Sequence, residues 1–434
     1  MQTLIGRYCK DVKIFTDNIE EEALSTIYGI ANHPVFENTP IRIMPDTHSG
    51  KGIVIGFTAP LGEYVNPSHV GCDIGCQMTS LFYEGLVKEE DYPDLEHKVR
   101  NAIPTGFEIN KKKVFNDKDF FKFMNQQMRI ARSQWPEMVE SINITEKYVT
   151  EMLKRIGMDE GVFYKSPGSL GSGNHFLELG EHEGHSVWTI HCGSRNFGQK
   201  VFKYWDKISK KPAISREDRR EGIEEIKRKC KDKTKLASLI KEYTESQNAS
   251  KPIGYLQGEN MRGYLTDVFF CQAYASWNHK CIGDAISNIM MKKGYGKVID
   301  TINTIHNYIS PRDHIIRTGA IASYEGERLI IPFNMRDGLA ICEGKSNPDW
   351  NYSAPHGAGR IMSRSKAKEN VNLEEFRESM KGIYSTSIGT GTIDESPMVY
   401  KPMEEIIENI EPTVEILYLI KPCINIKAME TVDE

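Results

Sequence analysis

Gly173-Asn174-His175-Phe176-Leu177-Glu178-Leu179 and Ser186-Val187-Trp188-Thr189-Ile190-His191-Cys192 are two β-rich runs on either side of a short polar segment that contains a glycine. This pattern predicts a β-hairpin. If the turn centres near residue 183, His175 and His191 lie directly opposite each other, with their backbones about 5 Å apart. Two imidazoles at the open end of one hairpin suit a metal ion. The alternative is a pair of unrelated strand histidines.

Strands and helices are expected on both sides of this hairpin. Residues 41–44 and 298–305 have the β-rich composition of strands, and residues 20–32 and 85–160 have helical patterns. We expect residues 255–289, which are rich in small and aromatic side chains, to form a pair of long buried helices. No internal repeat or linker divides the chain, so residues 1–434 are expected to form one domain.

Composition limits the class of protein. Of the 434 residues, 39% are apolar and 26% are charged, as in soluble globular proteins, and the net charge is −5. Any site for a polyanion must therefore be a local patch. Residues 206–251 carry fourteen Lys or Arg against nine Asp or Glu. This charged helical excursion is either a solvated surface or a surface that faces a polyanion.

The cysteines and the apolar runs indicate a cellular location. The nine cysteines are odd in number and scattered, unlike the dense framework of a secreted module. The N-terminus lacks the apolar core of a signal peptide, and no run approaches the roughly 18 apolar residues of a spanning helix. We therefore expect a cytoplasmic protein with reduced thiols and no membrane insertion.

Several potential metal ligands lie near predicted strand ends. Asp73 and Cys76 are three residues apart across Gly75, so a carboxylate and a thiolate can converge on one cation. His306 follows the strand predicted at 298–305. With His175 and His191 these residues provide ligands for one or two divalent ions, and ligand softness alone favours zinc.

A histidine with a different environment lies in Ser353-Ala354-Pro355-His356-Gly357-Ala358-Gly359-Arg360, which continues into a helix-like run ending in Arg364. Glycines allow close backbone approach, and a helix start offers free N–H groups to a phosphate. The stretch is typical of a nucleophile beside a phosphate, although a lone histidine is more often structural. The chain has no Lys-x-Asp-Gly of lysine-dependent nucleotidyl transferases, which makes His356 the candidate nucleophile.

From about residue 40 to the carboxyl end, the chain resembles the RtcB family of RNA ligases. Specific motifs carry the resemblance in the family's order: Pro45-Asp46-Thr47-His48-Ser49-Gly50-Lys51-Gly52, Val70-Gly71-Cys72-Asp73-Ile74-Gly75-Cys76, Gly173-Asn174-His175-Phe176-Leu177-Glu178, His191-Cys192-Gly193-Ser194-Arg195, His306-Asn307 and residues 353–360. The resemblance implies one large α+β domain with central β-sheets surrounded by helices and a metal site at strand ends.

The resemblance also implies an activity. Family members are GTP- and manganese-dependent ligases that join an RNA 2′,3′-cyclic phosphate or 3′-phosphate to a 5′-hydroxyl, in RNA repair or tRNA splicing. The histidine matching His356 attacks the α-phosphorus of GTP and carries GMP, which passes to the RNA 3′-phosphate and is displaced by the 5′-hydroxyl. Asp46 matches an aspartate required near the 5′-hydroxyl. Some members use an archease-like activator.

The family's binding residues transfer to matching positions of this chain. Two manganese ions, in place of zinc, would be held by Asp73, Cys76, His175, His191 and His306. The positions of the nucleotide pocket are Asn174, Glu178, Asn334, Tyr400 and Lys427. Glu178 and Lys427 would read the donor and acceptor edges of guanine, and Arg195, Arg360 and Arg364 would hold phosphates.

The chain departs from the family pattern at residues 333–336, Leu339, Ile316 and Thr318. These positions concern recognition of the nucleotide and of the RNA end. They leave open a metal-dependent RNA-end-processing enzyme, either a cyclic phosphodiesterase or a 3′-end guanylyltransferase, that does not ligate. A third reading is a protein that binds RNA ends through the basic 206–251 surface without catalysis.

Overall fold

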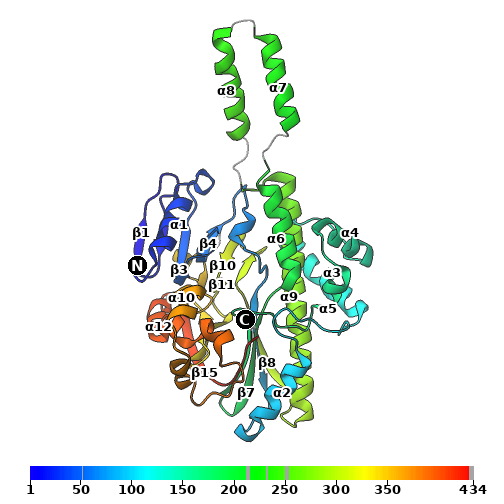
Figure 1. Ribbon diagram of the computed structural model, residues 1–434, viewed down its shortest axis with the longest axis vertical. Helices are drawn as coiled ribbons and strands as arrows, with labels where there is room; N and C mark the ends of the chain where they lie inside the picture. The colour runs from blue at the N-terminus through cyan, green and yellow to red at the C-terminus, as the bar shows by residue number, and fades with distance from the viewer. Residues whose placement is uncertain (51, 212–215, 231–232, 250–253, 430–434) are drawn as a thin grey trace.

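The structure is a computed structural model that describes residues 1–50, 52–211, 216–230, 233–249 and 254–429. It has the expected α+β architecture, with strands at the centre and helices packed around them (Figure 1). Among the described residues, no helix is both long enough and apolar enough to cross a membrane.

A seven-stranded sheet forms the larger half of the centre. Its order is β12 (Arg328–Asn334), β13 (Gly338–Gly344), β15 (Val414–Ile426), β6 (Phe176–His182), β7 (His185–Cys192), β5 (Gln77–Tyr83) and β8 (Val298–Ile305). All seven residues of β5 are buried. Met78 and Phe82 belong to one apolar cluster and Leu81 and Tyr83 to another, so both faces of this strand are covered.

A six-stranded sheet forms the second half. Its order is β1 (Gln2–Leu4), β2 (Val12–Ile14), β3 (Ile41–His48), β4 (Ile55–Pro60), β10 (Ile315–Thr318) and β9 (Asn307–Ile309). The predicted strand at 41–44 is therefore β3, which extends through the polar Pro45-Asp46-Thr47-His48. A separate antiparallel pair joins β11 (Ala320–Ala322) to β14 (Ser353–Pro355), directly before His356.

Helices surround these sheets. The helix predicted at 20–32 is α1 (Glu21–Ala31), and the segment 85–160 contains α2 (Tyr92–Ala102), α3 (Asp117–Gln134), α4 (Glu146–Ile156) and α5 (Glu160–Lys165). The remaining α-helices are α6 (Arg195–Ser209), α7 (Arg216–Lys229), α8 (Lys233–Ala249), α9 (Gly258–Lys292), α10 (Arg364–Asn370), α11 (Leu373–Ser379) and α12 (Met403–Ile410).

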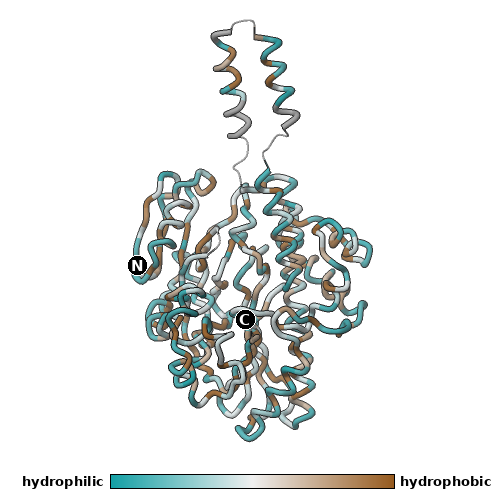
Figure 2. The backbone as a smooth tube through the Cα atoms, in the orientation of Figure 1, coloured by the Kyte–Doolittle hydropathy of each residue, from teal (hydrophilic) through white to brown (hydrophobic). Residues whose placement is uncertain are grey.

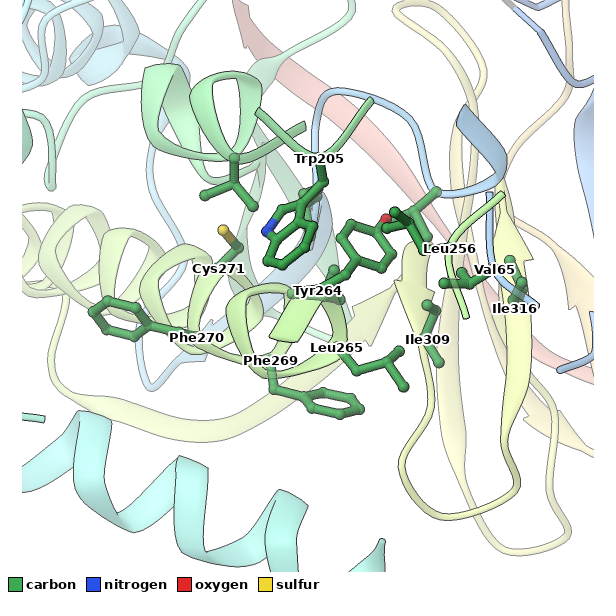
Figure 3. Packing of buried hydrophobic residues seen from close by; sticks show 14 of the residues in the cluster. Val65, Trp205, Leu256, Tyr264, Leu265, Phe269, Phe270, Cys271, Ile309 and Ile316 are labelled. Atoms are coloured by element: carbon green, nitrogen blue, oxygen red, sulfur yellow. The ribbon is translucent and has the colours of Figure 1, made fainter. Parts of the chain in front are cut away.

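The helix pair expected at 255–289 is wrong, because α9 is one continuous helix of 35 residues. Its interior glycines do not break it; they allow close packing. A Cβ at Gly263 would lie 2.8 Å from the Trp205 ring, and one at Gly283 would lie 3.2 Å from Leu81. Figure 3 shows Trp205 of α6 against Tyr264 of α9, within the largest apolar cluster. The long helix thus forms a rigid support beside β5 and β7.

The charged excursion forms two helices, α7 and α8, which pack together and project from the body (Figure 1). Hydrophobic residues lie among hydrophilic ones on both helices (Figure 2). Parts of the predicted 206–251 segment, at 212–215, 231–232 and 250–251, lie outside the described residues. A role for this surface in binding a polyanion stays a prediction.

Candidate functional site

A cavity of about 980 Å³ lies at one end of the strands of the seven-stranded sheet. At this end β5 and β6 begin while β7 and β8 end, because neighbouring strands are antiparallel. Cys76, His175 and His306 lie one residue outside β5, β6 and β8, and His191 is the second-last residue of β7. Segments far apart in the sequence thus meet at one wall of the cavity.

The predicted ligand side chains converge there in two overlapping groups. Asp73, Cys76 and His175 form one group, and Cys76, His191 and His306 form the other; within each group the donor atoms lie within 4.8 Å of one another. Cys76 Sγ lies 3.6 Å from His175 Nε2 and 3.4 Å from His191 Nε2. Because the thiol belongs to both groups, its sulfur is placed to be shared between two ions.

Backbone carbonyls orient two of the imidazoles. His175 Nδ1 lies 3.0 Å from the Leu170 carbonyl oxygen, and His191 Nδ1 lies 3.2 Å from that of Asn174. The proton on each Nδ1 is thereby donated to the backbone, and each Nε2 faces Cys76. This arrangement of the outer hydrogen bonds is typical of histidines that bind a metal through Nε2.

The ionisation of the cluster fits a divalent cation. Burial lowers the pKa values of His191 and His306 well below the usual value, so both are neutral imidazoles, the form that binds metals. Burial opposes ionisation of Asp73, but interactions with His175, Cys76 and His306 together outweigh it and lower the pKa of Asp73 to about 2. Burial and the Asp73 charge raise the pKa of the Cys76 thiol well above its usual value. A bound cation would supply the positive charge that a thiolate needs here.

The register predicted for the hairpin is wrong by one residue. His182 pairs with His185 around a two-residue turn, and His191 pairs with Phe176. The turn residues Glu183 and Gly184 both have positive φ, 49° and 79°, which is the backbone of a type I′ turn. His175 lies one residue before β6, yet its ring centroid is still 5.4 Å from that of His191. The two histidines therefore meet diagonally.

His356 lies beside this cluster in the same cavity. Its ring centroid lies 4.9 Å from that of His306. His356 Nδ1 lies 2.6 Å from Asp46 Oδ2, and Asp46 is fully buried at the end of β3. If Nδ1 donates its proton to this carboxylate, the lone pair of the imidazole is on Nε2. Asp46 Oδ1 has no hydrogen-bond partner among the described atoms.

The helix-like run expected after His356 is absent, because the helix begins only at Arg364. Residues 359–361 instead pair with residues 399–401: Lys401 N donates to Gly359 O, and Ile361 N donates to Val399 O. Gly359 has φ +77°, and a Cβ there would lie 2.1 Å from the Asp46 backbone oxygen. The loop is thus folded tightly onto the strand that carries Asp46.

The cavity also contains buried polar groups that suit a heterocyclic base. Burial raises the pKa of Glu178 to about 8, and Asn425 Nδ2 donates to Glu178 Oε2 at 2.8 Å. Lys427 is 3% exposed and donates to the Asn174 carbonyl oxygen and to Glu395 Oε2. The Glu178 and Lys427 side chains thus line the same cavity, and the Lys427 ammonium group lies over the ring of Phe176.

Most of the residues predicted from the sequence line this one cavity. They are Asp73, Cys76, His191, His306, Asn174, Glu178, Asn334, His356, Arg360, Arg364, Tyr400 and Lys427. Three others lie behind its walls: Asp46 and His175, which contact lining residues, and Arg195. The Arg195 guanidinium donates to Ser169 Oγ and the Gly106 carbonyl oxygen, so phosphate binding by Arg195 stays a prediction.

Of the positions that depart from the family pattern, Ile316, Thr318, Arg336 and Leu339 do not line the cavity. Leu339 is fully buried in an apolar cluster, and Thr318 donates through its hydroxyl to the His69 carbonyl oxygen. Asn334 does line the cavity, but its side chain is engaged in a local turn with Asp337. Of these positions, Phe333, Asn334 and Met335 border the site directly.

Sequence reasoning missed two cavity residues, Glu395 and Asn425. Glu395 follows Asp394 in an ordinary acidic pair, and Asn425 lies two residues before Lys427. The spacing of Asn425 and Lys427 on an extended strand, which places both on one face, is the signal that could have identified Asn425. No local signal identifies Glu395, since its partners come from distant segments.

Several known proteins are similar to this chain over most of its length. RNA-splicing ligase RtcB of Escherichia coli K12 is 27% identical, over 96% of this chain and 97% of that protein. The tRNA-splicing ligase RtcB of Aeropyrum pernix is 27% identical over 84% and 83%. RNA-splicing ligase RtcB of Mycobacterium tuberculosis is 25% identical over 84% and 91%.

The family described as tRNA-splicing ligase RtcB matches residues 26–428, which include every candidate site residue named above. The match covers the whole seven-stranded sheet, four strands of the six-stranded sheet (β3, β4, β9 and β10) and the residues that line the cavity from His48 onward. The chain therefore belongs to the RtcB family.

Proposed function

We propose that this protein is an RNA ligase that uses GTP and manganese to join a 2′,3′-cyclic phosphate or 3′-phosphate end to a 5′-hydroxyl end. The observation that carries the proposal is the contact of His356 with Asp46 beside a cluster of thiol, carboxyl and imidazole groups. Relatives over nearly the whole chain are named RNA-splicing ligases, which supports the same activity. We take residues 1–434 as one catalytic unit acting in the cytoplasm.

His356 is the proposed nucleophile. Asp46 accepts the Nδ1 proton and thereby keeps Nε2 unprotonated for attack on the α-phosphorus of GTP. The new N–P bond forms as the bond to the bridging oxygen of pyrophosphate breaks, leaving GMP on the histidine. GMP then passes to the RNA 3′-phosphate, and the 5′-hydroxyl oxygen displaces it to form the phosphodiester.

Asp73, Cys76, His175, His191 and His306 would hold the metal. Manganese at this place would neutralise phosphate charge and lower the pKa of a coordinated hydroxyl. The residues' own contribution is to orient donors, since backbone carbonyls fix the His175 and His191 rings. In the proposed pocket, Glu178 and Lys427 face the guanine edge, and Arg360 and Arg364 face phosphates.

The test is transfer of label from α-labelled GTP to the protein in the presence of Mn²⁺. We expect an acid-labile, base-stable label on wild type and none on His356→Ala. The control is His97→Ala, on the exposed face of α2, which should label like wild type. Persistent labelling of His356→Ala would overturn the assignment of the nucleophile.

A substrate with a 2′,3′-cyclic phosphate and a 5′-hydroxyl on one RNA separates ligation from end processing. We expect circular RNA that resists exonuclease. If the products are only linear RNA with a 3′-phosphate or a capped 3′ end, the protein is an end-processing enzyme. Adding an archease-like activator to the same assay tests whether repeated turnover needs that partner.

A further inference from the structure

Glu395 lies at the centre of the cavity's charged network. It ends the 3-10 helix Thr390–Glu395 and is 2% exposed. Its Oε1 forms an ion pair with Arg364 Nη1 at 2.5 Å and accepts a hydrogen bond from Arg360 Nη1 at 3.3 Å. Its Oε2 accepts from the Tyr400 hydroxyl at 2.6 Å and from Lys427 Nζ at 3.2 Å. One buried carboxylate therefore joins four donor side chains.

These four donors come from three separate segments. Arg360 and Arg364 follow the His356 loop, Tyr400 follows a short 3-10 turn, and Lys427 lies just beyond β15. All four line the cavity beside His356. Two backbone hydrogen bonds join residues 359–361 to residues 399–401, but among the described residues no strand pairing joins either segment to Lys427. Glu395 is therefore the group that connects the side-chain charges of all three segments.

The charges in the network explain why this support is needed. Arg360, Arg364 and Lys427 bring three positive charges into one partly buried region, where mutual repulsion is weakly screened. Glu395 and Asp394, which accepts from Arg364 at 2.7 Å, bring two negative charges. One positive charge remains in surplus, which suits a polyphosphate anion. Burial opposes ionisation of Glu395, but Lys427 and the two arginines keep its pKa at about 2.

We propose that Glu395 is a positioning residue for GTP binding, which holds Lys427 at the base end and the two arginines at the phosphate end in one fixed arrangement. This inference rests on the proposed function. Glu395 acts through its four donors and leaves the His356–Asp46 contact unchanged. A substitution should therefore affect nucleotide affinity far more than the chemical step.

A competing role is that Glu395 occupies the place of an anion. In that case its carboxylate would have to release Arg360 and Arg364 before a phosphate could bind, and removing its charge would strengthen GTP binding. The two roles predict opposite changes in affinity, so one substitution distinguishes them.

The experiment compares Glu395→Gln with wild type in the Mn²⁺-loaded protein. Equilibrium binding of a guanosine triphosphate analogue with an α,β-methylene bridge separates affinity from chemistry. We expect the dissociation constant to rise by ~10- to 100-fold, as for loss of a charge-assisted network. At saturating GTP, the single-turnover labelling rate should stay within about threefold of wild type.

Two further variants complete the test. Glu408→Gln, on the exposed face of α12, is the matched control and should bind like wild type. Glu395→Asp keeps the charge but shortens the reach, so its affinity should lie between those of Glu395→Gln and wild type. It also serves if Glu395→Gln does not fold, as judged by thermal melting.

Unchanged affinity in Glu395→Gln would overturn the positioning role, and tighter binding would establish the competing one. Failure of the proposed function looks different. In that case wild type itself would neither bind the analogue nor become labelled.

Discussion

The two walls of the cavity are built by different means. On the metal side, Cys76, His191 and His306 flank neighbouring strands of one sheet, and α9 packs behind them. On the nucleotide side, Arg360, Tyr400 and Lys427 come from loops and a strand terminus and are joined by ion pairs to Glu395. One wall is positioned by packing and strand register, and the other by mutual charge. We therefore expect metal-side substitutions to act mainly on metal binding, and the effects of nucleotide-side substitutions on GTP affinity to be coupled through Glu395.

The largest effect is expected from substitution of a metal-side residue, as a loss of Mn²⁺ affinity. Cys76→Ala removes the sulfur shared by both ligand groups, so both sites should lose affinity together. We expect Mn²⁺ affinity to fall by ~100-fold or more, since even indirect contacts to a metal contribute 10- to 100-fold. Metal content after gel filtration, measured by mass spectrometry, checks this. Cys423→Ala is the control, and equal metal content in both variants would contradict a shared thiolate.

Asp46→Asn should affect chemistry while leaving the metal bound. An amide at this place can donate to His356 Nδ1, which favours the tautomer with its proton on Nε2. We expect the labelling rate to fall by roughly 10³- to 10⁴-fold, as when the aspartate that orients a catalytic histidine is made an amide. Rapid-quench labelling measures the rate. A near-normal rate would show that Asp46 acts at another step, such as that of the 5′-hydroxyl.

Glu178 should make nucleotide binding depend on pH. Its pKa is raised to about 8, so the carboxyl group is neutral below that pH and ionised above it. The N1–H and amino group of guanine are donors and need the ionised acceptor. Affinity for GTP should therefore rise from pH 6.5 to about 8, by at most about tenfold per pH unit, and then level off. Calorimetric titration at several pH values checks this, and Glu178→Gln should flatten the rise.

The smallest effect on catalysis is expected from substitutions in α7 and α8, whose described residues do not line the cavity. Neutralising the exposed Arg220, Arg228 and Lys235 on the projecting helices should leave labelling unchanged. If these helices touch RNA, affinity should fall by a few-fold, and the salt dependence should fall by about one unit per lost phosphate contact. Fluorescence anisotropy across a salt series measures both. An unchanged dependence of RNA affinity on salt would show that these three side chains do not contact RNA phosphates.

The same contrast explains what the sequence could predict. The metal-side residues were identifiable because each lies near a strand end, and antiparallel strands bring such ends together. The exact pairing of His191 was missed by one residue, because it depends on the two-residue turn at Glu183 and Gly184. The continuity of α9 was not predicted. Its interior glycines, Gly263 and Gly283, serve close packing against Trp205 and Leu81, which the sequence alone does not show.

The nucleotide side was less predictable from local patterns. Resemblance to the family identified Lys427 and Tyr400, but Glu395 became visible only when three distant segments were brought together. The absence of a helix between Arg360 and Arg364 has a similar cause. The backbone there pairs with residues 399–401, and such long-range pairing overrides local helical propensity.

Gly359 has a consequence for reading other sequences of this kind. A Cβ at this position would collide with the Asp46 backbone, so the close main-chain approach that brings His356 to the Asp46 carboxylate requires glycine here. A relative with a larger residue here would have to displace a whole strand edge. We therefore expect relatives in which this histidine and aspartate work as a pair to have glycine three positions after the histidine.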